Sequence, residues 1–197
     1  QMSHYAAMTV QILFATRVLG LSEQAVGLCY MGVGLGTIGG SVFGRRISQA
    51  LGPGPCLVLG YAICASGWLL LALAPLGAWG VAAFAWMLMS FSAGAVFIFI
   101  NFLALRQSVT PEPLLGRMTS TMRWLTLLPA APGALLGGWL GQHAGLRSAL
   151  LFAGAVSLLL ALVAWRLPLV RRLRMLPQLE HDSQWLGVEA EVRPTTV

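Results

Sequence analysis

The chain has 197 residues, of which 57% are hydrophobic and only 9% are charged, and its formal net charge is +6. A soluble domain carries about 25% charged residues, so this composition excludes an ordinary soluble protein and predicts an integral membrane protein. The basic residues, all arginine, are not gathered in one segment, so we expect no nucleic-acid partner. The three cysteines and three histidines show no metal-ligand spacing, so we expect neither a metal nor a cofactor.

Apolar segments alternate with short polar or Gly/Pro-rich stretches along the chain, which predicts an all-α protein with six membrane-spanning helices. The predicted spans cover residues 1–18, 25–44, 56–74, 80–105, 119–141 and 147–167. We expect the chain to be a piece of a longer protein. The first span is short, which fits a helix whose beginning is missing. Residues 1–168 therefore form one six-span domain, and residues 169–197 are predicted to be a disordered cytoplasmic tail.

Loops are predicted where charge or helix breakers interrupt the apolar pattern, chiefly at residues 45–55 and 106–118. His143 is expected in the loop that precedes the last span. Pro129 and Pro132 should kink the fifth span, because proline removes a backbone donor and clashes with the preceding turn.

The first span is the most polar one and supplies the best candidates for a cavity lining. His4, Met8 and Gln11 share one helical face, and Tyr5 lies next to it. Polar groups that face lipid are expensive, so this face is predicted to line an aqueous cavity that receives the substrate. The alternative is a partly exposed, truncated helix that tolerates polar residues.

Glycine recurs at every fourth residue in two spans, which predicts close approach of a second helix backbone. The first ladder is Gly32, Gly36, Gly40 and Gly44, and the second is Gly133, Gly137 and Gly141. Gly34, Gly36 and Gly39 also match a dinucleotide-binding fingerprint, but no acid follows about 20 residues later, as that fold requires.

The two ladders lie in the second and fifth spans, three spans apart. Because three is odd, two equivalent groups of three spans would have opposite orientations in the membrane. This pattern predicts a 3+3 inverted repeat, which is the plan of many transporter halves.

Arginine is distributed unequally over the predicted loops. The loops after spans two, four and six contain or border Arg45, Arg46, Arg106, Arg117, Arg123, Arg166, Arg171, Arg172 and Arg174. The opposite side receives only Arg17 and Arg147. The arginine-rich side is predicted to be cytoplasmic, which places the C-terminus in the cytoplasm.

Two further polar residues lie within or close to spans. Arg123 is predicted either to reach the headgroups from near a helix end or to contact an anionic substrate. Asn101 is predicted either to hold neighbouring helices together or to line the cavity. No Asp, Glu or Lys occurs within a predicted span.

Three segments carry a resemblance to a known family: LGLSEQAVGL at 19–28, GRRISQALGPG at 44–54 and LRQSVTPEPLLGRMTSTMR at 105–123. The chain resembles the second half of a major facilitator superfamily transporter, in the branch of enterobactin-type siderophore exporters and macrolide-type efflux proteins. Arg45, Arg46 and Arg117 match the basic loop signature of that family, although Gly44 replaces the acid that usually precedes the pair.

The resemblance implies half of a twelve-helix fold and a secondary transporter that exports small organic molecules by alternating access. Its partners would be membrane lipids, the N-terminal six-helix half and a small-molecule substrate, and it would lie in the inner membrane of a bacterium. The alternative is a non-transporting six-span module or a truncated assembly partner. An intramembrane enzyme is not expected, since neither Ser90 nor Ser92 has a glycine two positions earlier.

Overall fold

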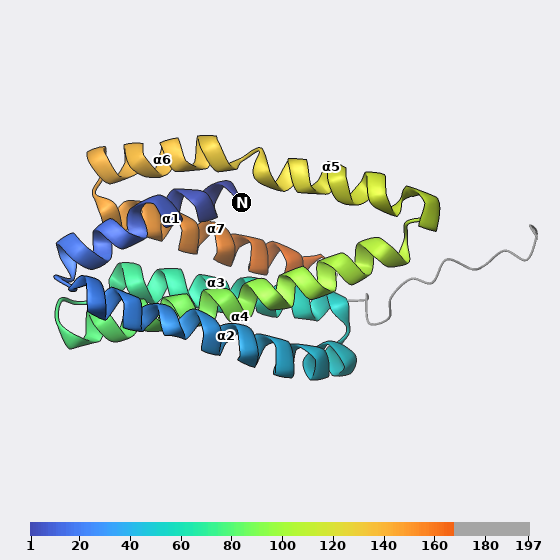
Figure 1. Cartoon of the computed structure of the whole chain (residues 1–197), viewed down its shortest axis with the longest axis horizontal. Coiled ribbons are helices and arrows are strands. Elements are labelled where there is room, and N and C mark those ends of the chain that lie inside the picture. Colours follow the sequence, from blue (N-terminus) through green and yellow to red (C-terminus); the bar gives the residue numbers. More distant parts are fainter. Residues whose placement is uncertain (168–197) are drawn as a thin grey trace, which may run out of the picture.

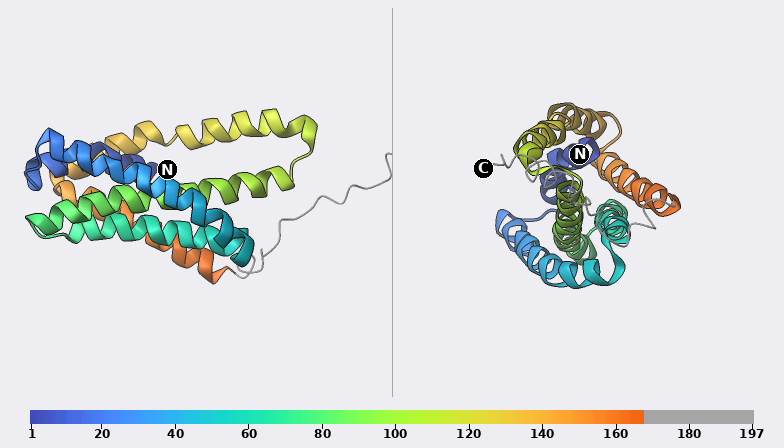
Figure 2. Two further views of the ribbon diagram at one scale, coloured as in Figure 1. Left: turned by 60° about the horizontal axis from the view of Figure 1, so that its bottom comes forward. Right: turned by 90° about the vertical axis from the view of Figure 1, so that its right-hand side faces the viewer.

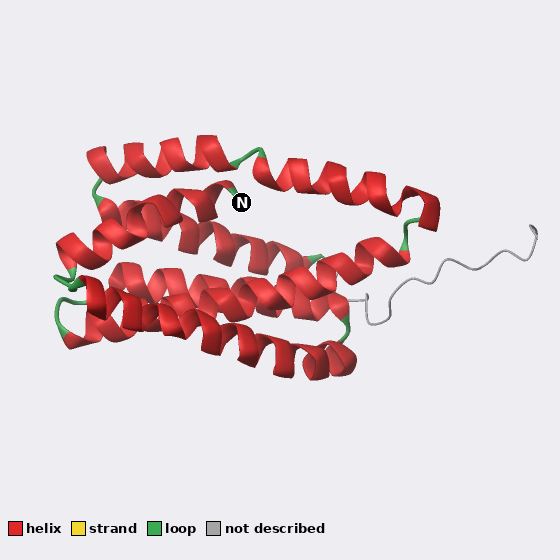
Figure 3. Cartoon of the chain, viewed as in Figure 1, coloured by secondary structure: helices red, strands yellow, loops and turns green. Residues whose placement is uncertain are grey.

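The computed structural model describes residues 1–167, and all the regular secondary structure in that part of the chain is helical (Figure 3). The helices are α1 (Met2–Leu13) with its π-helical continuation η1 (Phe14–Val18), α2 (Glu23–Leu51), α3 (Pro53–Leu73), α4 (Ala78–Ser108), the 3-10 turn η2 (Glu112–Leu114), α5 (Leu115–Leu127), α6 (Ala130–His143) and α7 (Leu146–Arg166). The predicted tail at 169–197 lies outside the described residues.

The all-α class and the membrane character are confirmed. Within residues 1–167, four helices, α2, α3, α4 and α7, are long and apolar enough to cross a membrane. The first predicted span is the shorter α1 with η1, and the fifth is divided between α5 and α6. The count of six spans and the inverted repeat therefore stay predictions.

Two predicted loops are largely helical, which corrects their boundaries. Helix α2 continues through Arg45 and Arg46 to Leu51, and α4 continues through Arg106 to Ser108. Arg117 lies in the first turn of α5 instead of in a loop. Charge alone does not end a helix, since arginine is a good helix former. The chain turns only at Gly52, whose φ of 85° suits glycine, before Pro53 begins α3.

The predicted kink in the fifth span is confirmed at Pro129. Helix α5 ends at Leu127 and α6 begins at Ala130, so the interruption surrounds the first proline. Pro132 lies in the first turn of α6, where a missing backbone donor costs little. The prediction of a loop at His143 is wrong, because this residue is the last of α6.

The helices form two neighbouring groups in the bundle, one of α2, α3 and α4 and the other of α1, α6 and α7 (Figures 1 and 2). Helix α4 packs against α2 and α3, α3 also packs against α7, and α1 packs against α6 and α7. The C-terminal ends of α2, α4 and α7 lie at one end of the bundle. The C-terminal ends of η1, α3 and α6 lie at the other end.

One apolar core joins the groups. It contains Phe14 from η1, Trp68 and Leu71 from α3, Phe84 from α4 and Leu150 from α7, each at most 2% exposed. Because these five side chains come from four elements, the core fixes the relative positions of the first, third, fourth and last predicted spans.

The first glycine ladder lets α2 approach the backbone of α4. A Cβ added to Gly36 would overlap the Met89 carbonyl oxygen and the Ser92 hydroxyl. A Cβ on Gly40 would lie 3.0 Å from the Ala93 carbonyl oxygen, and one on Gly32 would lie 3.1 Å from the Ala85 carbonyl oxygen. Gly44 lies over the Phe97 ring. The ladder therefore occupies the contact between two long helices.

The second ladder makes the same kind of contact between α6 and α1. A Cβ on Gly137 would overlap the backbone of Ala6, and one on Gly133 would lie 2.5 Å from the Met2 carbonyl oxygen. A Cβ on Gly141 would lie 3.3 Å from Val10. Each ladder thus packs against the first helix of the other predicted triplet, α4 for the first ladder and α1 for the second.

We expect Gly36→Ala to lower the free energy of unfolding of the full-length protein in detergent by about 1–3 kcal/mol, because the added methyl group meets backbone that cannot move alone. Gly39→Ala in the same helix is the matched control, since a Cβ there meets nothing within 4 Å. Equal stability of the two variants, measured by thermal or denaturant unfolding, would contradict the packing described for α2 and α4.

Candidate functional site

The predicted cavity face of α1 carries a hydrogen bond to α2. Gln11 is 1% exposed, and its Nε2 donates to the Tyr30 hydroxyl at 3.1 Å. The same Nε2 lies 3.2 Å from the Met8 sulfur, whereas Met8 itself is 41% exposed. The hydrogen bond between Gln11 and Tyr30 therefore links α1 to α2.

His4 lies two turns from Gln11 on α1 and is surrounded by aromatic rings. Its imidazole stacks on Phe91 of α4, with ring centroids 4.4 Å apart and planes inclined by 6°. The Trp68 ring lies 6.2 Å from His4 and 5.8 Å from Phe91. Tyr5 completes the group at 5.5 Å from His4.

We call His4, Gln11, Tyr30, Trp68 and Phe91 the α1 cluster. It brings together three of the five polar candidates from the sequence if Tyr5 at its edge is included, and it adds Tyr30, Trp68 and Phe91, which sequence analysis missed. These three residues belong to other helices and carry no local signal of their own. A histidine in an apolar helix could have suggested these aromatic neighbours only once the helix packing was known.

A short π-helix follows the cluster directly. In η1 the Leu19 N–H donates to the Phe14 carbonyl oxygen at 3.1 Å, which widens the helix by one residue. Such turns occur frequently at functional sites. The sequence predicted an uninterrupted helix here, because one extra residue per turn hardly changes the hydrophobic period.

Asn101 lies apart from the α1 cluster, at the far end of α4. It is 2% exposed, its Nδ2 donates to the Phe97 carbonyl oxygen at 2.8 Å, and its Oδ1 accepts from Ser48 of α2 at 2.6 Å. The amide nitrogen thus bonds within α4, and the amide oxygen bonds across to α2. This arrangement favours the role of a tie between α2 and α4 over that of a cavity lining.

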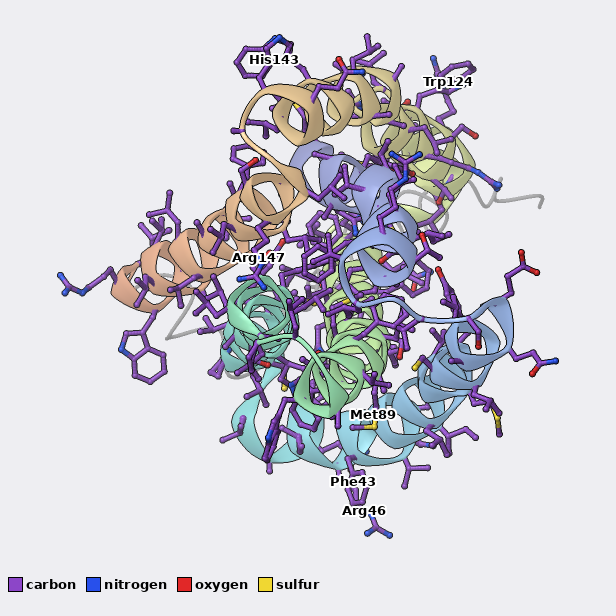
Figure 4. The ribbon with its side chains drawn as sticks, turned by 90° about the vertical axis from the view of Figure 1, so that its left-hand side faces the viewer. Phe43, Arg46, Met89, Trp124, His143 and Arg147 are labelled. Carbon is purple, nitrogen blue, oxygen red and sulfur yellow. The ribbon has the colours of Figure 1, made fainter. Side chains whose placement is uncertain are left out.

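Arg123 is exposed on α5, and the structure does not bring it to the α1 cluster. Together with Ser120, Trp124 and Leu127 it lines an open hollow of about 300 Å³ on the outside of that helix. No residue of α5 is buried, and α5 packs closely on none of the other long helices described. Figure 4 shows Trp124 pointing away from the bundle.

Arg147 has a role beyond marking the topology. Its guanidinium donates to the Ala74 carbonyl oxygen at 2.9 Å and lies over the Phe14 ring at 5.9 Å. Ala74 follows the last residue of α3, so the arginine satisfies a carbonyl group that the helix leaves free. Figure 4 shows Arg147 directed inward between α7 and α3, whereas His143 points outward.

The dinucleotide-binding alternative is wrong for this chain. Gly34, Gly36 and Gly39 all lie inside α2, whereas the fingerprint needs a strand, a tight turn and then a helix. Gly36 is occupied by its contact with α4 and offers no open backbone to a phosphate.

A family model described as the Major Facilitator Superfamily matches residues 1–193. No curated protein and no solved structure matches the chain.

We expect the Ser48–Asn101 contact to be worth about 0.5–1.5 kcal/mol of coupling in a double-mutant cycle. The cycle compares Ser48→Ala, Asn101→Ala and the double variant by the free energy of unfolding. Strict additivity of the two single changes would show that Asn101 does not tie α2 to α4.

Proposed function

The chain belongs to the major facilitator superfamily and is therefore a membrane transporter protein, and on this basis we propose that it forms the C-terminal six-helix half of a secondary transporter. The complete transporter exports small organic molecules, of drug or siderophore type, by alternating access. The N-terminal six-helix half is its partner, and the substrate passes between the two halves.

The exchanged glycine contacts are the observation that carries this proposal. In the first triplet, α1–α3, the glycines of α2 pack against α4. In the second triplet, α4–α7, the glycines of α6 pack against α1. The third helices of the two triplets, α3 and α7, pack against each other. This reciprocity is what a two-fold axis in the membrane plane requires of an inverted repeat.

In the proposed mechanism the two halves rock about a central site, and the glycine contacts preserve the packing within this half. Helices α1 and α4, the first of each triplet, supply His4, Gln11 and Phe91 to that site. The exposed apolar face of α2 covers lipid or the other half of the transporter. It consists of Leu28, Met31, Leu35, Ile38 and Val42.

We further propose that the protein lies in the inner membrane of a bacterium with its C-terminus in the cytoplasm. Support comes from the arginines, because Arg45, Arg46, Arg106 and Arg166 lie near the ends of α2, α4 and α7 that share one end of the bundle. Arg17 and Arg147 lie near the opposite end. Such a bias supports a cytoplasmic location of the arginine-rich end.

Reporter tags inserted after Gly52 and after Gly77 are expected to appear on opposite sides of the membrane, with the first tag in the cytoplasm. Both sites are helix junctions, so an insertion there does not interrupt a helix. Accessibility of the tags in intact and permeabilised cells is the measurement. Detection of both tags in one compartment would refute the alternating arrangement.

Replacing Gly36 and Gly137 together by leucine in the full-length transporter should reduce transport at least tenfold while membrane insertion persists, because both replacements drive helices apart. The matched control replaces Gly39 and Gly138, where a Cβ meets nothing within 4 Å. Efflux of a panel of fluorescent organic molecules from cells or proteoliposomes is measured, with the amount of inserted protein as reference. Unimpaired efflux by the first double variant would refute the proposed role of the ladders.

A further inference from the structure

We propose that the α1 cluster binds an uncharged, planar aromatic molecule that carries N–H or O–H donors, with the Gln11 side-chain oxygen as the acceptor. This inference rests on the proposed transport function and specifies the substrate class of its central site. It depends on unpaired polar atoms, on the aromatic surroundings and on the lack of charged side chains in contact with the cluster among the described residues.

Unpaired buried polar atoms are concentrated on this face of α1. Three buried side-chain atoms in residues 1–167 have no hydrogen-bond partner, namely His4 Nδ1, Gln11 Oε1 and Arg106 Nε. Two of the three belong to the α1 cluster and lie two helical turns apart. A buried acceptor without a partner is costly, so a conformation in which a ligand supplies the missing donor is favoured.

The orientation of the Gln11 amide follows from its neighbours. The amide end that is in contact lies between the Met8 sulfur and the Tyr30 hydroxyl. A thioether can only accept a hydrogen bond, so the NH₂ group belongs on that side. The oxygen is therefore the vacant end, and the ligand group that satisfies it must be a donor.

The surroundings define the rest of the ligand. The His4 ring stacks on Phe91, and the Trp68 ring lies tilted against both, so the cluster offers aromatic surfaces that favour a flat aromatic body. Among residues 1–167, no Asp, Glu, Lys or Arg side chain makes a hydrogen bond or ring contact with the cluster. An ion without a counter-charge is expensive within the membrane, so the ligand is uncharged.

Entry of the ligand requires α1 to move, because Gln11 Oε1 is closed off from solvent in this conformation. The π-helical η1 lies three residues beyond Gln11 and gives the helix a place to change its winding. The half-exposed Met8 lies between His4 and Gln11 and offers a flexible side chain that can give way.

The test uses two fluorescent probes with the same ring system, an aminocoumarin and its N,N-dimethyl counterpart, in which methyl groups replace both N–H donors. Both are uncharged and planar, but only the first can donate to Gln11. Binding to the full-length protein in lipid nanodiscs is measured by fluorescence anisotropy for the wild type, Gln11→Leu and Thr9→Val. Thr9 is the matched control, since its hydroxyl bonds only the Tyr5 carbonyl oxygen of its own helix.

The wild type and Thr9→Val should bind the aminocoumarin about tenfold more tightly than the dimethyl probe. Gln11→Leu should remove this preference while it retains the affinity for the dimethyl probe. A preference that survives in Gln11→Leu, or a wild type that binds neither probe, overturns the proposed site.

Transport is measured separately in proteoliposomes, so the two proposals fail in different ways. Transport of other molecules without any preference between the probes overturns the site and leaves the transporter function standing. Preferential binding of the aminocoumarin without transport of any tested molecule supports the site and overturns the proposed function. A charged analogue that competes better than the aminocoumarin overturns the substrate class.

Discussion

Direct contact between helix backbones is the constraint on which this helix bundle depends. In lipid no hydrophobic effect drives helices together, so their association relies on how closely their atoms pack. Gly36 against Met89, Gly137 against Ala6 and the reciprocal pair Gly60 and Gly94 between α3 and α4 all remove a side chain at the point of crossing. Each crossing admits one relative position of two helices, and the apolar core around Trp68 then fills the space between them.

Local signals in the sequence predicted the all-helical class and several packing features of the fold. A four-residue period of glycine identifies a packing face without knowledge of its partner, and Pro129 interrupts its own helix wherever the helix lies. The helix ends at Leu51 and Ser108 were predicted poorly, because arginine marks membrane depth and not the end of a helix. The partner of each ladder could not be predicted, since it depends on how distant spans return to one another.

The residues of the candidate site also fall into those that the sequence predicts and those that it does not. His4 and Gln11 could be singled out because polar residues are unusual within an apolar helix. Tyr30, Trp68 and Phe91 look like ordinary membrane residues in the sequence, and only the folded chain brings them to the face of α1. Asn101 and Arg123 were equally conspicuous in the sequence, yet the structure gives one a hydrogen-bonded place between helices and leaves the other on an exposed surface.

The lengths of α2 and α4 have a mechanical consequence. At 1.5 Å per residue these helices of 29 and 31 residues measure about 43 and 46 Å, whereas a bilayer has a hydrocarbon core of about 30 Å. Two to three turns of each helix therefore exceed the thickness of the acyl core when the helix stands upright. The turns of α2 and α4 that carry Arg45, Arg46 and Arg106 are continuous helix instead of loop, so a tilt of either helix within the bilayer moves these arginines with it.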